Sequence, residues 1–299
     1  MKSRHVWRVS VITDTEAEDA VAEILRSVCD QPAASYMDLE TGTSESCVYF
    51  DRAPEAWTLL RRQLLHRLQG LESCGLQTGS VKVNLRKLTS NSWLQSWKKH
   101  FRPLEIGSAL LVKPGWSKRR RKPGQAIVVL DPGLSFGTGQ HPTTEFCLRG
   151  LVSVRGEIER PSLLDVGTGS GILAIAAAKL GFAPVDAFDL DPDSISVATK
   201  NAARNRVAPR ICFWRQDVAA LPKRSPRKYT LICANLLADL LMIHRDKLAA
   251  RVDSGGSLLL AGILKEEFEK VSAAYLACGL KCISRHTEGE WCSGRFRKE

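Results

Sequence analysis

From residue 161 onward, short apolar runs alternate along the chain with segments of helical periodicity. The apolar runs cover residues 162–167, 184–191, 210–217, 229–237 and 256–264, and the segments between them predict helices near 171–181, 193–205, 238–250 and 265–279. Strands that alternate with helices predict a parallel sheet covered on both faces. The last two runs, KCISRHTEG and EWCSGRFRK, have almost no spacer between them, which predicts an antiparallel hairpin at the sheet edge.

Residues 1–88 follow a different pattern, in which two strand and helix units succeed each other. The strands are HVWRVSVI, a short piece near ASYMDLE, CVYFD and SVKVNLRKL, and the helices are TEAEDAVAEILRSV and APEAWTLLRRQLLHRL. The order β-α-β-β-α-β predicts a small α+β, ferredoxin-like layer of sheet backed by two helices. Because such folds mostly bind partners, we predict that residues 1–88 form a recognition domain.

Residues 89–130 have no single period and contain several prolines and glycines. We therefore predict a linker and connector over residues 89–130, followed by the main α/β domain over residues 131–299. Trp93 and Trp97 lie four residues apart, which places them on one helical face, and we expect them to pack between the domains.

The composition is that of a globular protein, with 44% hydrophobic and 25% charged residues, and it excludes disorder throughout. No apolar stretch approaches the roughly 18 residues that a membrane helix needs, and the first residues lack the apolar region of a signal peptide. We expect a cytoplasmic monomer with no membrane partner. The nine cysteines never form a CxxC pair, so neither a disulfide framework nor a metal site is indicated.

The formal net charge of +11 comes partly from one basic run between two prolines. The run consists of Lys118, Arg119, Arg120, Arg121 and Lys122. Such a run can contact RNA phosphates, and it can equally form a solvated loop, so both interpretations stay open.

A glycine-rich turn connects the first strand of the α/β domain to the helix ILAIAAAKLG. Gly167, Gly169 and Gly171 allow a tight turn and a close approach to a ligand, and the following helix offers free N–H donors. The pattern fits NAD, FAD or S-adenosylmethionine. A nicotinamide site would have glycine at the position of Ile172, so the spacing disfavours NAD.

Polar side chains follow the next strands where these strands end. Asp189 comes 22 residues after Gly167, where a carboxylate can accept hydrogen bonds from ribose hydroxyls. Asp191 and Asp193 open a helix, and we interpret them as N-capping residues. Asp217 is either an adenine contact or a plain strand-end carboxylate.

Asn235 ends the fourth strand, so its amide should face the crevice at the carboxyl edge of the sheet. Ahead of the sheet, the Gly- and Thr-rich segment DPGLSFGTGQHPTT (residues 131–144) is either a loop that folds over a ligand or an ordinary cluster of turns. His141 in this segment is either a proton acceptor or a structural residue.

Several of these segments together resemble the PrmA family of bacterial methyltransferases, which modify the stalk-base protein of the large ribosomal subunit (protein L-eleven). The segments are WKKHFRP, LDPGLSFGTGQHPTT, LLDVGTGSGILAIAAAKLG, FDLDPDSI with NAARN, CANLLADLL, SGGSLLLAGIL and EWCSGRFRK. The resemblance covers nearly the whole chain, although the first 90 residues match only in element order. It implies a class I S-adenosylmethionine methyltransferase fold, an α/β fold with a Rossmann-like sheet of seven strands.

The resemblance also implies which residues bind S-adenosylmethionine. The family's cofactor residues fall on Thr144, Gly167, Asp189 and Asn235, and Gly169 belongs to the same turn. The implied activity is methylation of lysine side-chain and N-terminal amino groups of the ribosomal protein, and the basic run becomes a candidate contact for ribosomal RNA. No residue is assigned as a catalytic base.

Two kinds of alternative stay open. The chain could methylate another protein lysine or RNA. Methyltransferases that act on nucleic acids or release factors, however, usually have Asn/Asp-Pro-Pro-Tyr/Phe where this chain has Asn235-Leu236-Leu237-Ala238. The chain could also be a non-enzymatic module that binds RNA or protein. The intact glycines and Asp189 count against that second interpretation.

Overall fold

The computed structural model describes residues 5–31, 33–38, 43–50, 52–73, 76, 78–79, 81–89, 103–130 and 141–299. The chain divides into two compact units, Met1–His100 and Phe101–Glu299. Trp93 and Trp97, for which we predicted packing between the domains, lie outside the described residues.

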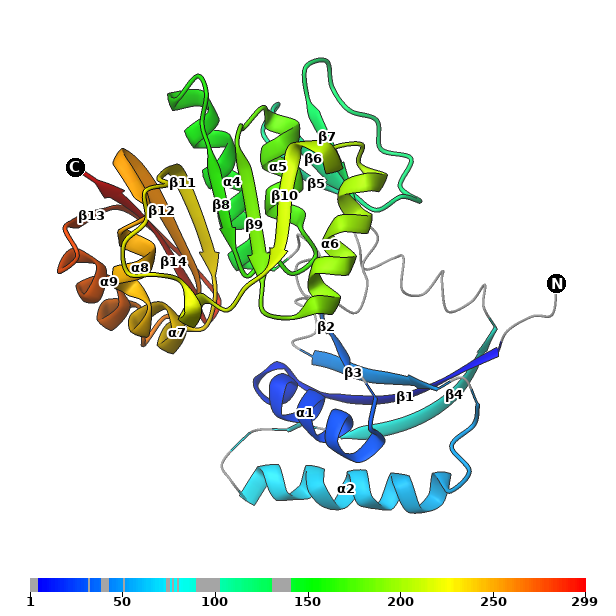
Figure 1. The fold of residues 1–299 in the computed structure, drawn as a ribbon. Coiled ribbons are helices and arrows are strands. Elements are labelled where there is room, and N and C mark those ends of the chain that lie inside the picture. Colours follow the sequence, from blue (N-terminus) through cyan, green and yellow to red (C-terminus); the bar gives the residue numbers. More distant parts are fainter. Residues whose placement is uncertain are drawn as a thin grey trace. The chain divides into compact units, whose positions relative to one another are not determined.

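The first unit is a four-stranded antiparallel sheet with two α-helices on one face (Figure 1). Its elements are β1 (His5–Asp14), a 3-10 turn (Thr15–Ala17), α1 (Glu18–Cys29), β2 (Ala34–Asp38), β3 (Thr43–Phe50), α2 (Trp57–Ser73) and β4 (Lys82–Thr89). The strand order β2-β3-β1-β4 is that of a ferredoxin-like fold, and the predicted order of elements is confirmed.

Helical periodicity explains why α1 packs on this sheet. The helix buries Val21, Ala22, Leu25 and Cys29, which lie on one face at helical spacing. Val21, Leu25 and Cys29 form a core with residues of β1 and α2, among them Val9, Val11, Leu64 and Leu68.

The second unit starts with a small three-stranded sheet. It consists of β5 (Leu104–Ile106), β6 (Leu110–Lys113) and β7 (Ala126–Val129), where β5 pairs antiparallel and β7 parallel with β6. We predicted a connector over residues 89–130, but residues 103–130 belong to the second unit. The physical reason is burial, because Leu110, Val112 and Val128 join the same core as the helices of the main sheet.

The main sheet has seven strands in the order β10-β9-β8-β11-β12-β14-β13. Its elements are α4 (Pro142–Glu157), β8 (Leu163–Val166), α5 (Ile172–Leu180), β9 (Val185–Asp189), α6 (Pro192–Arg204), β10 (Ile211–Arg215), β11 (Tyr229–Asn235), α7 (Ala238–Ile243), α8 (Arg245–Ala249), β12 (Val252–Leu264), α9 (Phe268–Leu276), β13 (Leu280–Glu288) and β14 (Trp291–Lys298), with 3-10 turns at Ala208–Arg210 and Val218–Ala220. Neighbours from β10 to β12 pair in parallel, and β14 pairs antiparallel with both β12 and β13. The predicted parallel sheet, its seven strands and the edge hairpin are thus confirmed. The helix predicted over 238–250 is instead divided at His244, whose backbone leaves the helical region.

Alternating side chains of the strands bury both faces of this sheet. In β8, Leu163 belongs to the core that includes α4 and α5, whereas Leu164 belongs to the core that includes α7 and α9. Leu259 and Leu260 of β12 divide between the two cores in the same way. Both layers of helices are visible in Figure 1.

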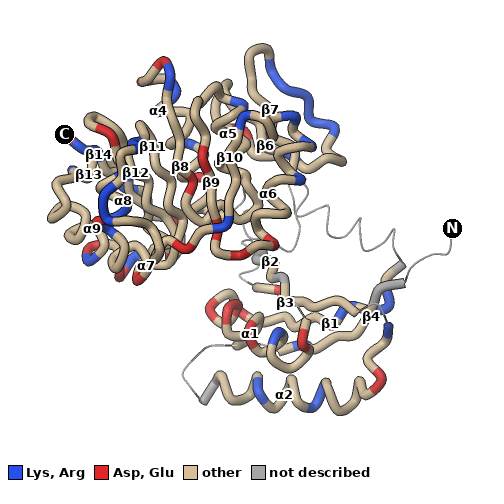
Figure 2. Tube along the Cα trace, in the orientation of Figure 1, with Lys and Arg blue, Asp and Glu red and all other residues tan. Residues whose placement is uncertain are grey.

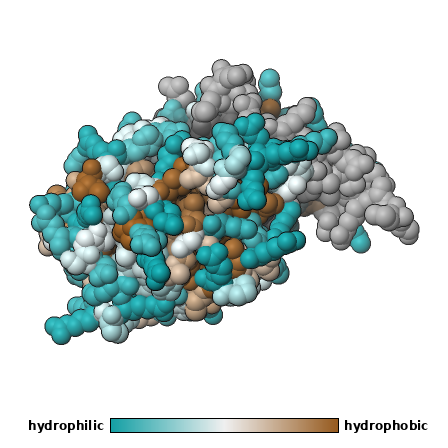
Figure 3. Space-filling view, turned by 90° about the horizontal axis from the view of Figure 1, so that it is seen from above, coloured by the Kyte–Doolittle hydropathy of each residue, from teal (hydrophilic) through white to brown (hydrophobic). Residues whose placement is uncertain are grey.

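The surface is mixed in character. Seen from above, hydrophilic residues cover most of the visible face and hydrophobic residues gather near its middle (Figure 3). No helix in the described part of the chain is both long and apolar enough to cross a membrane.

Candidate active site

The glycine turn between β8 and α5 needs glycine for conformational and steric reasons. Gly167, Gly169 and Gly171 have φ values of +73°, +51° and +81°, in the left-handed region that other residues avoid. A Cβ atom at Gly167 would lie 2.6 Å from Leu236 Cδ2, and one at Gly171 would lie 2.9 Å from Ala198 Cβ. The turn therefore lies directly against the end of β11 on one side and against α6 on the other.

Asp189 is half-buried at the carboxyl end of β9 and is hydrogen-bonded to the glycine turn. Its Oδ2 accepts the Gly169 N–H at 2.9 Å, and its Oδ1 accepts the Asp191 N–H at 3.1 Å. Each carboxylate oxygen can accept a further hydrogen bond. The carboxylate is thus held in place with acceptor capacity for the two hydroxyls of a ribose.

The neighbouring aspartates have structural roles in the helices and turns that follow. Asp191 caps α6, because its oxygens accept the N–H groups of Asp193 at 2.9 Å and Ser194 at 3.2 Å. Asp193, which we also interpreted as a capping residue, lies in the first turn of the helix and donates to that cap. Asp217 caps the 3-10 turn through Ala219 N–H at 2.7 Å, and its contact with adenine stays a prediction.

The start of α4 is joined to the end of β11 by a chain of hydrogen bonds. Asn235 Nδ2 donates to Thr143 Oγ1 at 3.2 Å, and Thr143 Oγ1 lies 2.7 Å from His141 Nδ1. His141 Nδ1 accepts the Thr143 backbone N–H at 3.4 Å, so this nitrogen is an acceptor and the Thr143 hydroxyl donates to it as well. His141 also caps α4 and lies edge-on to the Trp291 ring at 5.0 Å.

Thr144 is the one cofactor residue of the predicted set with a buried polar atom that lacks a partner. Its side chain is 1% exposed, and its Oγ1 finds no hydrogen-bond partner in the described part of the structure. Leaving a buried hydroxyl unpaired costs about 1–3 kcal/mol. A ligand that hydrogen-bonds this hydroxyl therefore fits the site. Residues 131–140 of the predicted ligand loop lie outside the described residues.

Asp165 is a site residue that the sequence analysis did not single out. It is 1% exposed, and its Oδ2 accepts the Thr168 hydroxyl at 2.7 Å, which ties β8 to the glycine turn. Burial raises the pKa of this carboxyl to about 7, against the opposing effect of hydrogen bonds from Thr168 and the Ala174 N–H. The signal was present in the sequence, because Asp165 is the only charged residue in the otherwise apolar run SLLDVG.

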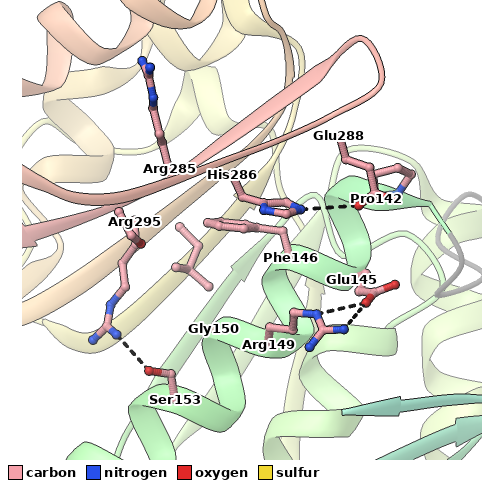
Figure 4. Close-up of a pocket in the computed structure, with 12 residues that line it drawn as sticks. Pro142, Glu145, Phe146, Arg149, Gly150, Ser153, Arg285, His286, Glu288 and Arg295 are labelled. Carbon is pink, nitrogen blue, oxygen red and sulfur yellow. Dashed lines mark hydrogen bonds and ion pairs between the residues drawn. The ribbon is translucent and has the colours of Figure 1, made fainter. Parts of the chain in front are cut away.

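A groove of about 320 Å³ lies beside α4, between this helix and the hairpin of β13 and β14 (Figure 4). The rings of Phe146 and His286 stack across it, with centroids 6.5 Å apart. Its charged groups are paired within the chain, as in the ion pairs of Arg149 with Glu145 and of Arg295 with Glu157. We therefore assign the groove no part in cofactor binding.

The predicted residues converge at the carboxyl edge of the parallel strands. Gly169 contacts Asp189, Gly167 lies against Leu236, and Asn235 is bonded to Thr143 beside Thr144. Crevices at this edge are where open α/β sheets bind nucleotides. The pattern of a glycine turn, a ribose carboxylate, a strand-end amide and a buried hydroxyl suits a cofactor that contains a nucleoside.

The model of one protein family matches residues 5–299, and the description of that family is "Ribosomal protein L11 methyltransferase (PrmA)". A ribosomal protein L11 methyltransferase from Trichlorobacter lovleyi is 42% identical over 215 residues, which cover 71% of this chain and 69% of the relative. One from Streptococcus agalactiae is 32% identical over 311 residues and covers 98% of this chain and 96% of the relative.

A solved structure is similar as well. The ribosomal protein L11 methylase of Lactobacillus delbrueckii subsp. bulgaricus superposes with a TM-score of 0.59 at 31% identity. The match covers 67% of this chain and all of that chain.

Proposed function

The chain belongs to the ribosomal protein L11 methyltransferase (PrmA) family of S-adenosylmethionine-dependent enzymes, and from this premise we propose that its substrate is ribosomal protein L11. We propose that it methylates lysine side-chain amines and the N-terminal amine of that protein. Membership of the family supports the substrate. The observation that carries the methyl-transfer chemistry is the convergence of Asp189, the glycine turn, Asn235 and the unpartnered Thr144 hydroxyl at one sheet edge.

We assign the cofactor contacts to the residues predicted from the sequence. Asp189 would accept the ribose hydroxyls, and Gly167 and Gly169 would let the ligand approach the backbone. Thr144 would donate its unpaired hydroxyl to the cofactor, and Asn235 would hold the cofactor as well as orient the acceptor amine. S-adenosylmethionine supplies a methyl group on a positively charged sulfur. Asp165 acts indirectly on the cofactor site, because its hydrogen bond with the Thr168 hydroxyl maintains the conformation of the glycine turn.

The acceptor amine must be neutral and aligned with the methyl group before transfer. A lysine amine has an ordinary pKa of about 10.4, and burial next to a positive charge lowers that pKa. Asn235 is placed to orient the amine through Oδ1, since its Nδ2 is already held by Thr143. His141 Nδ1 receives a hydrogen bond in that same chain, so we assign His141 to positioning rather than to proton removal.

We assign substrate recognition to the ferredoxin-like unit. All of the cofactor residues come from the second unit, which leaves the first unit free to bind the protein substrate. We further propose that the enzyme works in the cytoplasm as a monomer, because its substrate class is ribosomal and one chain supplies the whole cofactor site.

Only some residues of the basic run at 118–122 are available for a contact with ribosomal RNA. Arg119 and Lys122 are already paired with Glu105. Lys118, Arg120 and Arg121 are exposed and remain candidates for that contact.

The experiment is intact-mass spectrometry of L11 after incubation with S-adenosylmethionine and either this enzyme or its Asp189→Ala variant. We expect a ladder of mass increments of one methyl group with the wild-type protein and none with the variant. Calorimetry with S-adenosylmethionine should show binding only to the wild-type protein, and circular dichroism checks that the variant is folded.

Cofactor binding without any change in the mass of L11 would contradict the proposed substrate and leave the enzyme class intact. Other lysine-bearing proteins and RNA would then be tested in the same assay. Equal methylation by Asp189→Ala would contradict the assignment of the cofactor site.

A further inference from the structure

The edge of the main sheet that lies opposite the active site collects basic side chains. Helices of a parallel α/β sheet run opposite to its strands, so α5 and α6 end at the amino edge of the strands. Lys179 lies in the last turn of α5, Arg206 follows α6, and Arg210 ends the 3-10 turn before β10. Arg206 and Arg210 are exposed, and Lys179 is half-buried.

The long loop between β6 and β7 projects at the same end of this unit, and Figure 2 shows it as an almost continuous basic segment. Its conformation is held by its own side chains, because Arg119 Nε donates to Glu105 Oε1 at 2.6 Å and Lys122 Nζ to Glu105 Oε2 at 2.8 Å. Lys113 Nζ also donates to the carbonyl oxygens of Ser117 at 2.8 Å and Arg119 at 2.9 Å.

The remaining basic residues of this loop, Lys118, Arg120 and Arg121, make no ion pair with any described residue. The loop thus uses some of its cations to fix its own fold and leaves the others exposed to solvent.

The loop and the sheet edge form one surface. Asn205 fixes their spacing, because its Oδ1 accepts the Val129 N–H at 2.7 Å and its Nδ2 donates to the Val129 carbonyl at 2.8 Å. The pKa of Lys179 is lowered first by burial and then by the charges of Arg206, Arg210 and Arg121. These like charges repel one another, and a bound anion would relieve the repulsion.

Arg206 has an unfavourable backbone conformation for an arginine. Its φ of +58° lies in the left-handed region, where glycine or asparagine is usual, because Arg206 is the residue that follows the C-cap of α6. Its N–H donates to the Ala203 carbonyl at 2.9 Å, and the Val207 N–H donates to the Ala202 carbonyl at 3.0 Å.

We propose that Lys118, Arg120, Arg121, Lys179, Arg206 and Arg210, here called the basic edge, bind the phosphate backbone of RNA. The inference rests on the proposed function, because RNA is the polyanion that accompanies a ribosomal protein. An anionic membrane fits less well, since a lipid-binding surface joins its cations to exposed apolar residues. The exposed large hydrophobics among the described residues of this unit are Leu190, Leu237, Leu240, Ile243, Leu276 and Ile283, and none of them lies in the β6–β7 loop or at the C-terminal ends of α5 and α6.

The test measures RNA binding by the full-length protein without cofactor and without L11. A fluorescent RNA hairpin is titrated at several KCl concentrations with the wild type, with Arg206→Gly/Arg210→Ala, and with Lys265→Ala/Lys270→Ala. The last pair removes the same charge from exposed positions after β12 and in α9. We expect binding about tenfold weaker for the first pair only, with a salt dependence reduced by about one unit of slope per lost phosphate contact.

Arg206→Gly separates binding from folding. Because glycine accepts the left-handed conformation, this variant should melt no lower than the wild-type protein, so its weaker binding cannot come from unfolding. Equal losses in both double variants would overturn the proposal. So would vesicles containing phosphatidylserine, or polyglutamate, binding the basic edge as tightly as the RNA does.

Methylation of free L11 is measured on the same preparations. We expect Arg206→Gly/Arg210→Ala to keep this activity, since neither residue contacts the active site. Absence of L11 methylation by the wild-type protein would count against the proposed function. Loss of RNA binding by Arg206→Gly/Arg210→Ala with methylation retained supports the basic edge, and unchanged RNA binding by this variant would overturn the basic edge alone.

Discussion

Among the residues that we propose to bind the cofactor, Thr144 carries a single hydroxyl group whose role can be tested by itself. It is buried and has no partner among the described residues. Thr144→Val keeps the shape and removes the unpaired hydroxyl, so we expect a protein as stable as the wild type or about 1 kcal/mol more stable. Its affinity for S-adenosylmethionine should fall about tenfold, because one hydrogen bond to the ligand is lost.

Thermal denaturation and calorimetry measure the two quantities separately. Thr144→Ser keeps the hydroxyl and should recover most of the affinity. An unchanged affinity in Thr144→Val would remove Thr144 from the cofactor site.

The carboxyl group of Asp165 makes stability depend on pH. Burial raises its pKa from 3.8 to about 7, so the native protein holds a proton that the unfolded chain releases. The contribution of this protonated carboxyl to the free energy of unfolding is fully present below pH 3.8, the pKa of the group in the unfolded chain. It is lost as the pH rises through about 7, the pKa in the native protein. We expect Asp165→Asn, which cannot ionise, to gain stability relative to the wild type as the pH rises through this window, by at most about 1.4 kcal/mol per pH unit.

Urea denaturation of both proteins at a series of pH values from mildly acidic to neutral measures this difference. Parallel profiles would show that the buried carboxyl is ionised throughout.

At the scale of elements, an irregularity in β12 makes room for the side chain of Asn235. The register of β12 with β14 shifts between Leu260 and Ile263, and Gly262 there has a φ of +80°. A Cβ atom at Gly262 would lie 2.7 Å from the Leu236 carbonyl oxygen and 3.0 Å from Asn235 Oδ1. We expect Gly262→Ala to lower stability by about 1–3 kcal/mol and to slow methyl transfer, because Asn235 must move.

The same strand offers a matched control. Gly255 has a φ of +72°, but a Cβ atom there would have no neighbour within 4 Å. Gly255→Ala should therefore share the backbone cost and leave the transfer rate unchanged. Equal rates for both variants in the mass assay would contradict a role for the irregularity in placing Asn235.

The C-terminal end of α4 is fastened to β14 by a two-pronged ion pair. Both guanidinium NH groups of Arg295 donate to the Glu157 carboxylate at 2.7 Å. These bonds lower the pKa of Glu157 to about 2 from 4.5, so the stability they provide is present above pH 4.5 and is lost as the pH falls through about 2. Glu157→Gln should flatten this acid limb of the stability profile.

Thermal denaturation across the acid range compares Glu157→Gln with Glu159→Gln, an exposed neighbour that makes no ion pair with the described residues. An unaltered acid limb in Glu157→Gln would show that the pair contributes nothing to folding.

For the whole molecule, the division into two units predicts that binding of S-adenosylmethionine can be separated from recognition of the protein substrate. The core of the main sheet, the small sheet of β5 to β7 and all of the residues that we propose to bind the cofactor belong to Phe101–Glu299. We expect this fragment to fold cooperatively and to bind S-adenosylmethionine as tightly as the full chain does. It should methylate L11 at least about tenfold more slowly, because the recognition unit is missing.

Calorimetry and the mass assay compare the fragment with the full chain. Equal rates of L11 methylation would contradict the role of the first unit in recognition.

Local patterns in the sequence were enough to determine the elements and much of the site. The spacing of Gly167, Gly169 and Gly171 after an apolar strand requires a tight turn whatever lies around it, and a carboxylate at Asp189 follows at the end of the next strand. Such features depend on neighbours along the chain. Apolar periodicity likewise predicted the order of strands and helices in the first unit and after residue 161 in the second, because each period reflects the geometry of one element.

Only the tertiary structure decided the relations between distant residues. Thr143 is hydrogen-bonded to Asn235, which lies 92 positions further along the sequence. The pKa of Asp165 is raised by burial and not by its neighbours along the chain. Residues 103–130 join the second unit through core contacts that no local period reveals. The charges of Arg121 and Arg206 act on Lys179 because the fold brings the β6–β7 loop and the ends of α5 and α6 to one edge. Burial and long-range electrostatics arise from packing, and they exist only once the chain has folded.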